Sequence, residues 1–373
     1  GDGNVVYSYS LFRAWPTKVT PSELSYSSSE LATTSIEFRF DYAEENLDAF
    51  DIKIWHGQAN IVQQNSPLAD GIISRVGSSF GFGRGASAAA PAAALYSFTS
   101  FTFTNGGATG RNGPTSFAAD SSYTSQPWYS TYFSVASGIQ NWTAPATGNY
   151  LIRAAGAAGH GGVFSTFCRG IIIESTISLV SGQQYKILVG QMGIVNGTGS
   201  GGGGGGTFMA TAANSPIIVA GGGGGAVNNS ATLYSGSNGQ SGTSGSNSSD
   251  GTGSGGTNGN GGTGSFNGWG LVGGGFTGNG TDSANVINSR GLSFTNGGTG
   301  GNTATTAVGG FGGGAGTHGN TGGGGGGGGY SGGGGSNQNS NASVAGGGGS
   351  YSRTTISVIG YNTSHGYLTI TRI

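Results

Sequence analysis

Four histidines and one cysteine are the side chains of this sequence best suited to metal binding or acid–base chemistry. His56, His160, His318 and His365 lie far apart in the chain, and Cys168 has no second cysteine. Zinc sites use closely spaced ligands, and neither a C-x-x-C nor an H-x-x-H pattern occurs. The spacing therefore argues against a metal site, and the apolar context of the cysteine predicts a small buried hydrophobe.

Five carboxylates gather in the stretch "DYAEENLDAFD", where a calcium loop or a catalytic carboxylate pair could be sought. They are Asp41, Glu44, Glu45, Asp48 and Asp51. A calcium loop of the EF-hand type needs alternating acidic ligands, a central glycine and a glutamate at its twelfth position, and the stretch has none of this order. We predict an exposed acidic loop.

The glycine tracts superficially resemble phosphate-binding loops. Such a loop needs G-x-x-x-x-G-K-[ST] after a strand, and none of Lys18, Lys53 and Lys186 follows glycine in that way. The sequence also offers no Ser, His and Asp arrangement typical of nucleophilic catalysis. We predict that the chain is not an enzyme and that it uses no cofactor.

The composition excludes several partner classes. Only 7% of the 373 residues are charged, the formal net charge is -1, and the 13 Lys and Arg residues are scattered. Nucleic-acid binding needs clustered basic residues, and a membrane span needs about eighteen consecutive apolar residues, so neither partner is predicted. A single cysteine also excludes a disulfide within the chain.

The sequence of residues 1–44 predicts two β-strands in an antiparallel hairpin. The stretches "NVVYSYSLFRAWPTKV" and "TTSIEFRFDYAEE" alternate polar and apolar residues with the period of two that is typical of strands. Residues 45–94 are rich in Ala, Gly and Pro toward their end and predict a linker. The stretch "FDIKIW" within them could add one further strand.

Residues 95–373 predict an all-β domain into which glycine-rich segments are inserted. Short β-prone runs such as "SFTSFTFT", "GNYLIRAAGAAG", "QYKILVGQMG" and "SPIIVA" alternate with turn residues, and the chain ends in "HGYLTITRI". Glycine accounts for 84 residues of the chain. Its tracts lie at 201–206, 221–225, 322–329, 332–335 and 346–349.

Large apolar residues among the glycines indicate order, because a flexible linker would lack them. Glycine has no Cβ, so left-handed polyproline II segments of glycine can approach closely and hydrogen-bond side by side. We predict a polyglycine II bundle at about 193–350. For residues 227–262 within it, disorder is the alternative. Trp269, Phe276 and Tyr330 are candidate surface contacts, and the alternative is that these aromatics wedge between glycine helices.

The N-terminal 44 residues resemble part of a known structural protein. The order of a strand, a Trp15-Pro16-Thr17 turn, an "ELSYSS" strand and an alternating strand is similar to the C-terminal part of the tail tube protein of contractile bacteriophages. The resemblance implies a tube-type hairpin, or part of a barrel, that assembles with neighbouring subunits. About a hundred residues of a complete tube subunit would precede this point, so a truncated chain is one reading.

The glycine-rich part resembles a second family. "FTFTNGGATGRNGPT", "GIQNWTAPATGNYLIRAAGAAG", "PIIVAGGGGG" and "GGGGGGGGYSGG" occur in the same order in the glycine-rich region of anaplastic lymphoma kinase and leukocyte tyrosine kinase. The resemblance implies a tumour-necrosis-factor-like β-sandwich with inserted glycine helices over about 97–373. The chain lacks the cysteines of those receptors, and Gly106 stands where the first would be.

The segment "GGATGRNGPT" at Gly106–Thr115 predicts a tight loop at the edge of the sandwich. Glycines would supply positive φ angles, and Arg111 would be free to bind backbone carbonyls. The alternative is that this loop contacts a ligand.

Together these patterns predict a structural subunit of a phage tail or a similar tubular assembly. It would polymerise as a homo-oligomer or filament through the hairpin and display the glycine-rich domain for adhesion to a host glycan or protein. The predicted location is the virion or an extracellular assembly. The alternative is a secreted glycine-rich module that binds a protein or glycan ligand. The predicted assembly residues are Val5, Tyr7, Tyr9, Leu11, Trp15, Pro16, Ile36, Phe38 and Phe40.

Overall fold

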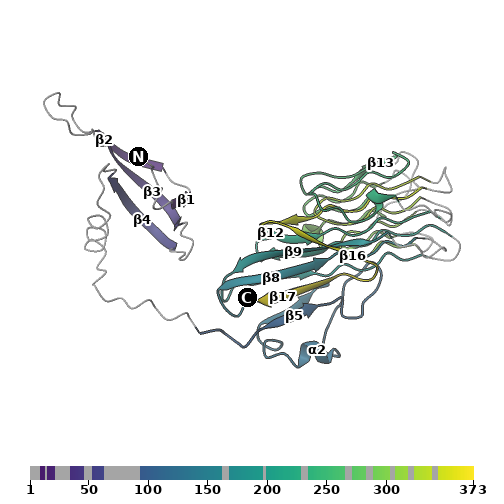
Figure 1. Cartoon of the computed structure of the whole chain (residues 1–373), viewed down its shortest axis with the longest axis horizontal. Coiled ribbons are helices and arrows are strands. Elements are labelled where there is room, and N and C mark those ends of the chain that lie inside the picture. The colour runs from purple at the N-terminus through teal and green to yellow at the C-terminus, as the bar shows by residue number, and fades with distance from the viewer. Residues whose placement is uncertain are drawn as a thin grey trace. The chain divides into compact units, whose positions relative to one another are not determined.

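The computed structural model divides the chain into two compact units, Gly1–Ala90 and Pro91–Ile373. In the first unit it describes residues 9–12, 15–21, 34–45 and 53–62. In the second it describes 93–373 except for short gaps at 162–167, 196–198, 228–233, 265–270, 283–288, 303–306, 318–322 and 338–342. Each unit is described by itself below (Figure 1).

The first unit is an antiparallel sheet of four strands. The strands are β1 (Tyr9–Phe12), β2 (Trp15–Pro21), β3 (Thr34–Glu45) and β4 (Lys53–Val62). β1 and β2 follow one another along one edge of β3, and β4 pairs along the other. The predicted two-stranded hairpin is therefore extended by β4, and the described strands form an open sheet and not a closed barrel.

The predicted assembly residues fall on three of these strands. Tyr9 and Leu11 lie on β1, Trp15 and Pro16 on β2, and Ile36, Phe38 and Phe40 on β3. Val5 and Tyr7 lie outside the described residues. β3 pairs with described strands along both edges, so Ile36, Phe38 and Phe40 lie on a central strand, and their role in assembly stays a prediction. Among the described strands, β4 and the pair β1 and β2 are the outer strands of the sheet.

The second unit contains two larger antiparallel sheets. One has five strands in the order β16-β9-β8-β17-β5, and the other has six in the order β15-β12-β11-β10-β7-β6. The strands of the first sheet are β5 (Ser100–Phe103), β8 (Gly148–Ala155), β9 (Gly170–Leu179), β16 (Ser357–Asn362) and β17 (Tyr367–Arg372). Those of the second are β6 (Phe133–Ala136), β7 (Ile139–Thr143), β10 (Gln184–Leu188), β11 (Thr207–Thr211), β12 (Pro216–Ala220) and β15 (Tyr351–Ser352).

Short elements complete the unit. They are the helix α2 (Ser121–Thr124), the pair β13 (Gly253–Ser254) and β14 (Thr263–Gly264), and the 3-10 turns η2 (Ser235–Ser237) and η3 (Phe294–Asn296). Asp120 caps α2 by accepting a hydrogen bond from the Ser122 N–H at 2.9 Å. The prediction of an all-β fold is confirmed.

An aromatic core fills the space between the two large sheets. The fully buried aromatic residues include Phe103 on β5, Trp142 on β7 and Tyr150 on β8. Trp128, in the segment between α2 and β6, is fully buried with them. Phe101 meets the Trp128 ring edge-on, with 4.8 Å between ring centroids. Such edge-to-face pairs are favoured by the ring quadrupoles, so this cluster fixes how the two sheets pack.

In the six-stranded sheet, β11 and β12 are buried on both faces. Ile187 and Met209 point into the aromatic core, whereas their chain neighbours Leu188 and Phe208 belong to a second apolar cluster. Phe276, Phe294 and Phe311, all from the glycine-rich region, complete this second cluster. Burial on both faces explains why β11 and β12 are continuous apolar runs and do not alternate.

The glycine tracts form a bundle of extended segments that lie side by side (Figure 1). In the segment 221–225, the N–H groups of Gly222 and Gly225 both donate to the segment 323–329, at Gly328 and Gly325. The intervening Gly223 and Gly224 donate to Ala157 and Ser237. A return to the same neighbour after three residues is what a polyproline II helix with three residues per turn produces.

The segment 323–329 occupies the centre of this bundle. Its N–H groups donate to 201–204, 271–274 and Gly346, and its carbonyls accept from 222–225, Ala315 and Gly333. None of its described glycines has a positive φ. Six neighbours around one segment, with backbone groups paired in each direction, are the arrangement predicted for a polyglycine II bundle.

Candidate functional site

Among the predicted surface contacts, Phe276 lies in the interior of the second unit. Phe276 is only 2% exposed and stacks on Phe294, with 4.9 Å between the ring centroids. This burial corrects the expectation that it contacts a partner, and it agrees with the alternative that the aromatics wedge within the glycine region. Trp269 lies outside the described residues.

Tyr330 and Arg111 are also held by neighbours within the unit. Tyr330 is half-buried and stacks on Tyr351 at 4.7 Å. Arg111 donates from Nε to the Gly300 carbonyl at 3.1 Å, and the Gly300 N–H donates back to the Arg111 carbonyl at 2.9 Å. Gly106 and Gly110 have φ of 58° and 78°, so the loop has the positive φ angles that its sequence predicts.

The described cysteine, histidines and carboxylates do not gather into a metal-binding cluster. Cys168 is fully buried, and burial raises the pKa of its thiol to about 11, so the reactive thiolate is suppressed. Among the described residues, no three His, Cys, Asp or Glu side chains come close enough to hold a metal ion. Nor does any helix described here have the length and apolarity to cross a membrane.

His365 has a structural contact that depends on its protonation state. Its Nδ1 accepts a hydrogen bond from the Met192 N–H at 3.1 Å, which only the neutral tautomer with a free Nδ1 can do. Burial lowers the pKa of His365 below its ordinary value.

We therefore expect the stability of the unit to decrease as the pH falls below about 6.5, where His365 of the unfolded chain gains its proton first. Because the side chain is only half-buried, the loss should stay below about 1 kcal/mol. Urea unfolding between pH 8 and pH 5 would measure the free energy of unfolding of the parent and of His365→Asn, which keeps an acceptor without titrating in this range. If the free energy of unfolding changed with pH in the same way in both proteins, His365 would not be the cause of the change.

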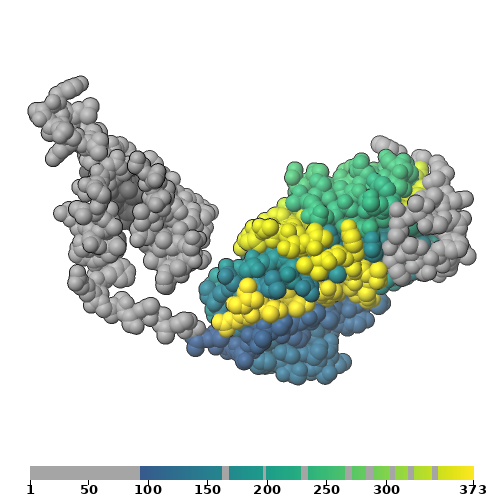
Figure 2. Space-filling view, viewed as in Figure 1, coloured from purple at the N-terminus to yellow at the C-terminus, as the bar shows by residue number. Residues whose placement is uncertain are grey.

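An exposed sheet edge is the most unusual surface of the unit. β16 is the outermost strand of the five-stranded sheet, and β9 is the strand with which it pairs among those described. Val358, Ile359 and Tyr361 are 52%, 47% and 44% exposed. Figure 2 shows the C-terminal part of the chain, in yellow, at the surface of this face. We call Ser357–Asn362 with these three side chains the β16 edge.

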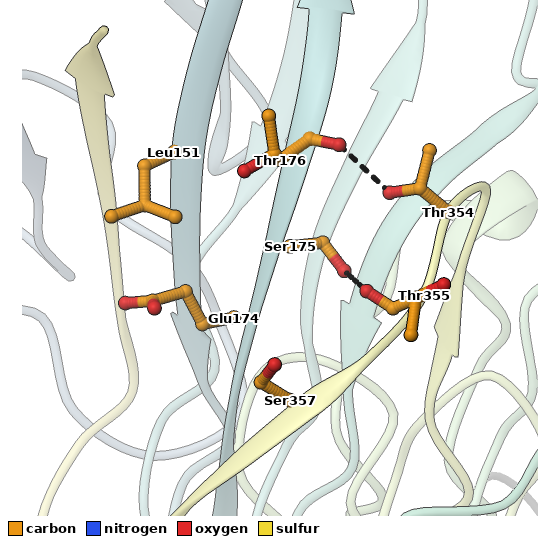
Figure 3. Close-up of a pocket in the computed structure, with 7 residues that line it drawn as sticks. All are labelled: Leu151, Glu174, Ser175, Thr176, Thr354, Thr355 and Ser357. Atoms are coloured by element: carbon orange, nitrogen blue, oxygen red, sulfur yellow. Dashed lines mark hydrogen bonds between the residues drawn. The ribbon is translucent and has the colours of Figure 1, made fainter.

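A shallow groove of about 410 Å³ adjoins the β16 edge on the outer face of the sheet (Figure 3). Ser175 Oγ donates to the Thr355 carbonyl at 2.6 Å, and Thr354 Oγ1 donates to the Thr176 carbonyl at 2.9 Å. These two bonds fasten the segment before β16 onto β9. The groove is lined by Leu151, Glu174, Ser175, Thr176, Thr354, Thr355 and Ser357.

The charges around this surface are largely neutralised. Glu174 accepts from Arg153, with 2.7 Å between the carboxylate and the guanidinium. The Arg169 guanidinium lies over the Tyr361 ring, 4.4 Å from its centroid, in a cation–π contact. The hydroxyls and the leucine of the groove suit this surface to hydrogen bonding and apolar contact.

Comparison with known proteins supports a likeness for the glycine-rich part. A stretch of 97 residues, 25% of this chain, is 39% identical to the leukocyte tyrosine kinase receptor of Mus musculus. The match covers 11% of that receptor. No family model matches the chain. The predicted resemblance to the kinase receptors is thus supported, whereas the resemblance of residues 1–44 to a tail tube protein stays a prediction.

Proposed function

We propose that this protein is a non-enzymatic structural subunit that self-associates and displays its glycine-rich unit for binding. The observation that carries the proposal is the first unit, a sheet of four described strands. Among these strands, β4 on one side and β1 with β2 on the other pair with β3 alone. Unpaired strand edges are templates for pairing with another chain. The assembly would be extracellular or a virion, as in a tail-type particle.

The second unit fits the displayed part of such a subunit. Its interior is fixed by two apolar clusters and by the glycine bundle, so it is a rigid carrier. The surface groove offers hydroxyls, one aliphatic side chain and the carboxylate of Glu174, a lining that suits a protein or glycan ligand. A binding module that acts as a monomer is the second candidate function, and the likeness to a receptor favours it.

Deletion of residues 1–90 tests the proposed assembly. We expect the full chain to form particles of many copies, and the 91–373 chain to be no larger than a dimer while retaining buried-tryptophan fluorescence. Multi-angle light scattering after size-exclusion chromatography measures the mass. A monomeric full chain would favour the second candidate function, and particles larger than a dimer that persist without residues 1–90 would show that the first unit is not the assembly element.

A further inference from the structure

β16 has an open side that the rest of the described chain does not cover. Its pairing with β9 runs from Ser357, opposite Glu174, to Asn362, opposite Gly170, with a bulge between Val358 and Gly360. No other described strand pairs with it. The outward N–H and C=O groups of an edge strand are ready to accept a further strand.

The usual protection of such an edge is weak here. Native edge strands are commonly guarded by charged side chains, by proline or by bulges. Residues 354–364 contain no Asp, Glu, Lys, Arg or Pro, and the bulge is the one guard present. Three large apolar side chains, Val358, Ile359 and Tyr361, are instead exposed along it. An uncharged, apolar edge of this kind favours an uncharged, apolar partner.

We propose that the β16 edge pairs antiparallel with the β16 edge of a second copy of this chain, around a two-fold axis between Ile359 and Gly360. In this register each Val358 lies opposite the second copy's Tyr361. Aromatic and β-branched residues form favourable cross-strand pairs, and a two-fold axis makes each such contact twice. The two five-stranded sheets would join into one continuous sheet. This contact is separate from the assembly proposed for the first unit.

The electrostatics of the pair are compatible with two identical partners. The Arg169 guanidinium lies over Tyr361 of its own copy. The two Tyr361 residues would be offset by three residues along the strands, roughly 10 Å. That separation is about one Debye length at ordinary salt, so repulsion between the two guanidinium groups is screened. An extended segment of a different protein would have no such symmetric match.

Amide hydrogen exchange of the full chain, read at peptide level over 353–364, tests the proposal directly. We expect exchange in this peptide to slow about tenfold as the protein concentration rises until nine-tenths of the copies are paired. Peptides from 9–62 report the first unit separately, so failure of one contact is distinguished from failure of the other. Exchange over 353–364 that does not change with concentration would overturn the proposal.

Ile359→Lys and Val180→Lys form a matched pair of variants. Ile359 is at the centre of the proposed contact, whereas Val180, 39% exposed, follows β9 in a turn away from β16. Lysine at 359 places two cations across the two-fold axis and should abolish the slowing of amide exchange at high protein concentration. Val180→Lys should leave that slowing unchanged. Protection that survives Ile359→Lys would show that the contact lies elsewhere and would also overturn the proposal.

Discussion

Replacement of Gly326 by alanine is expected to unfold the glycine bundle, or to destabilise the second unit by roughly 3 kcal/mol or more. A Cβ at this position would lie 2.1 Å from the Gly333 carbonyl oxygen and 2.8 Å from the Gly273 nitrogen. Both are backbone atoms and are hydrogen-bonded to one another at 2.9 Å. Neither atom can move without breaking backbone hydrogen bonds in the adjacent segments, so the clash cannot be relieved locally.

Gly242→Ala is the control for this prediction. Gly242 is exposed, has no positive φ, and a Cβ there would have no atom within 4 Å. Alanine should leave stability within about 1 kcal/mol of the parent, or raise it, because it restricts the unfolded chain. Urea unfolding followed by tryptophan fluorescence compares the two variants. Equal effects at Gly326 and Gly242 would show that the glycines are not close-packed as described.

Phe276→Ala is expected to destabilise the second unit by about 3–5 kcal/mol. The ring stacks on Phe294 at 4.9 Å and approaches Phe208 of β11 at 6.3 Å, so its removal leaves a cavity between the sheet and the bundle. Phe276→Leu keeps most of the volume and should cost much less.

Calorimetric unfolding of the two Phe276 variants separates a structural role from a binding role. A residue that only contacts a ligand would leave the unfolding temperature unchanged when truncated, because it would contribute nothing to the interior of the free protein. An unchanged unfolding temperature for Phe276→Ala would therefore contradict the packing described here and restore Phe276 as a candidate contact.

Much of the sandwich could be predicted because its strands carry a local signal. β17 alternates apolar and polar side chains, and the alternation survives in the fold, where Leu368 and Ile370 point into the core. β16 lacks this signal. Its exposed Val358 and Ile359 are adjacent in sequence, at a bulge, so no period of two marks the strand. The candidate site was missed for the same reason.

The arrangement of the glycine tracts could not be predicted, although their conformation could. A run such as 323–329 has no side chain that specifies which neighbour it meets, so its six partners become clear only from the folded backbone. Phe276 illustrates the same limit. Its sequence context, glycine on one side and Thr277-Gly278 on the other, suits an exposed tip as well as a buried wedge. The Phe276 side chain is buried because it packs against Phe208 and Phe294, which are distant in the chain.

The six-neighbour packing of segment 323–329 has a mechanical consequence. A β-sheet is stiff along its plane of hydrogen bonds but weaker between layers, where only side chains interdigitate. Around 323–329 hydrogen bonds radiate in every lateral direction. The bundle therefore has no preferred plane of shear, and a sideways load from any direction is distributed over backbone bonds. A bundle of this kind can resist a sideways load with almost no side chains between its segments.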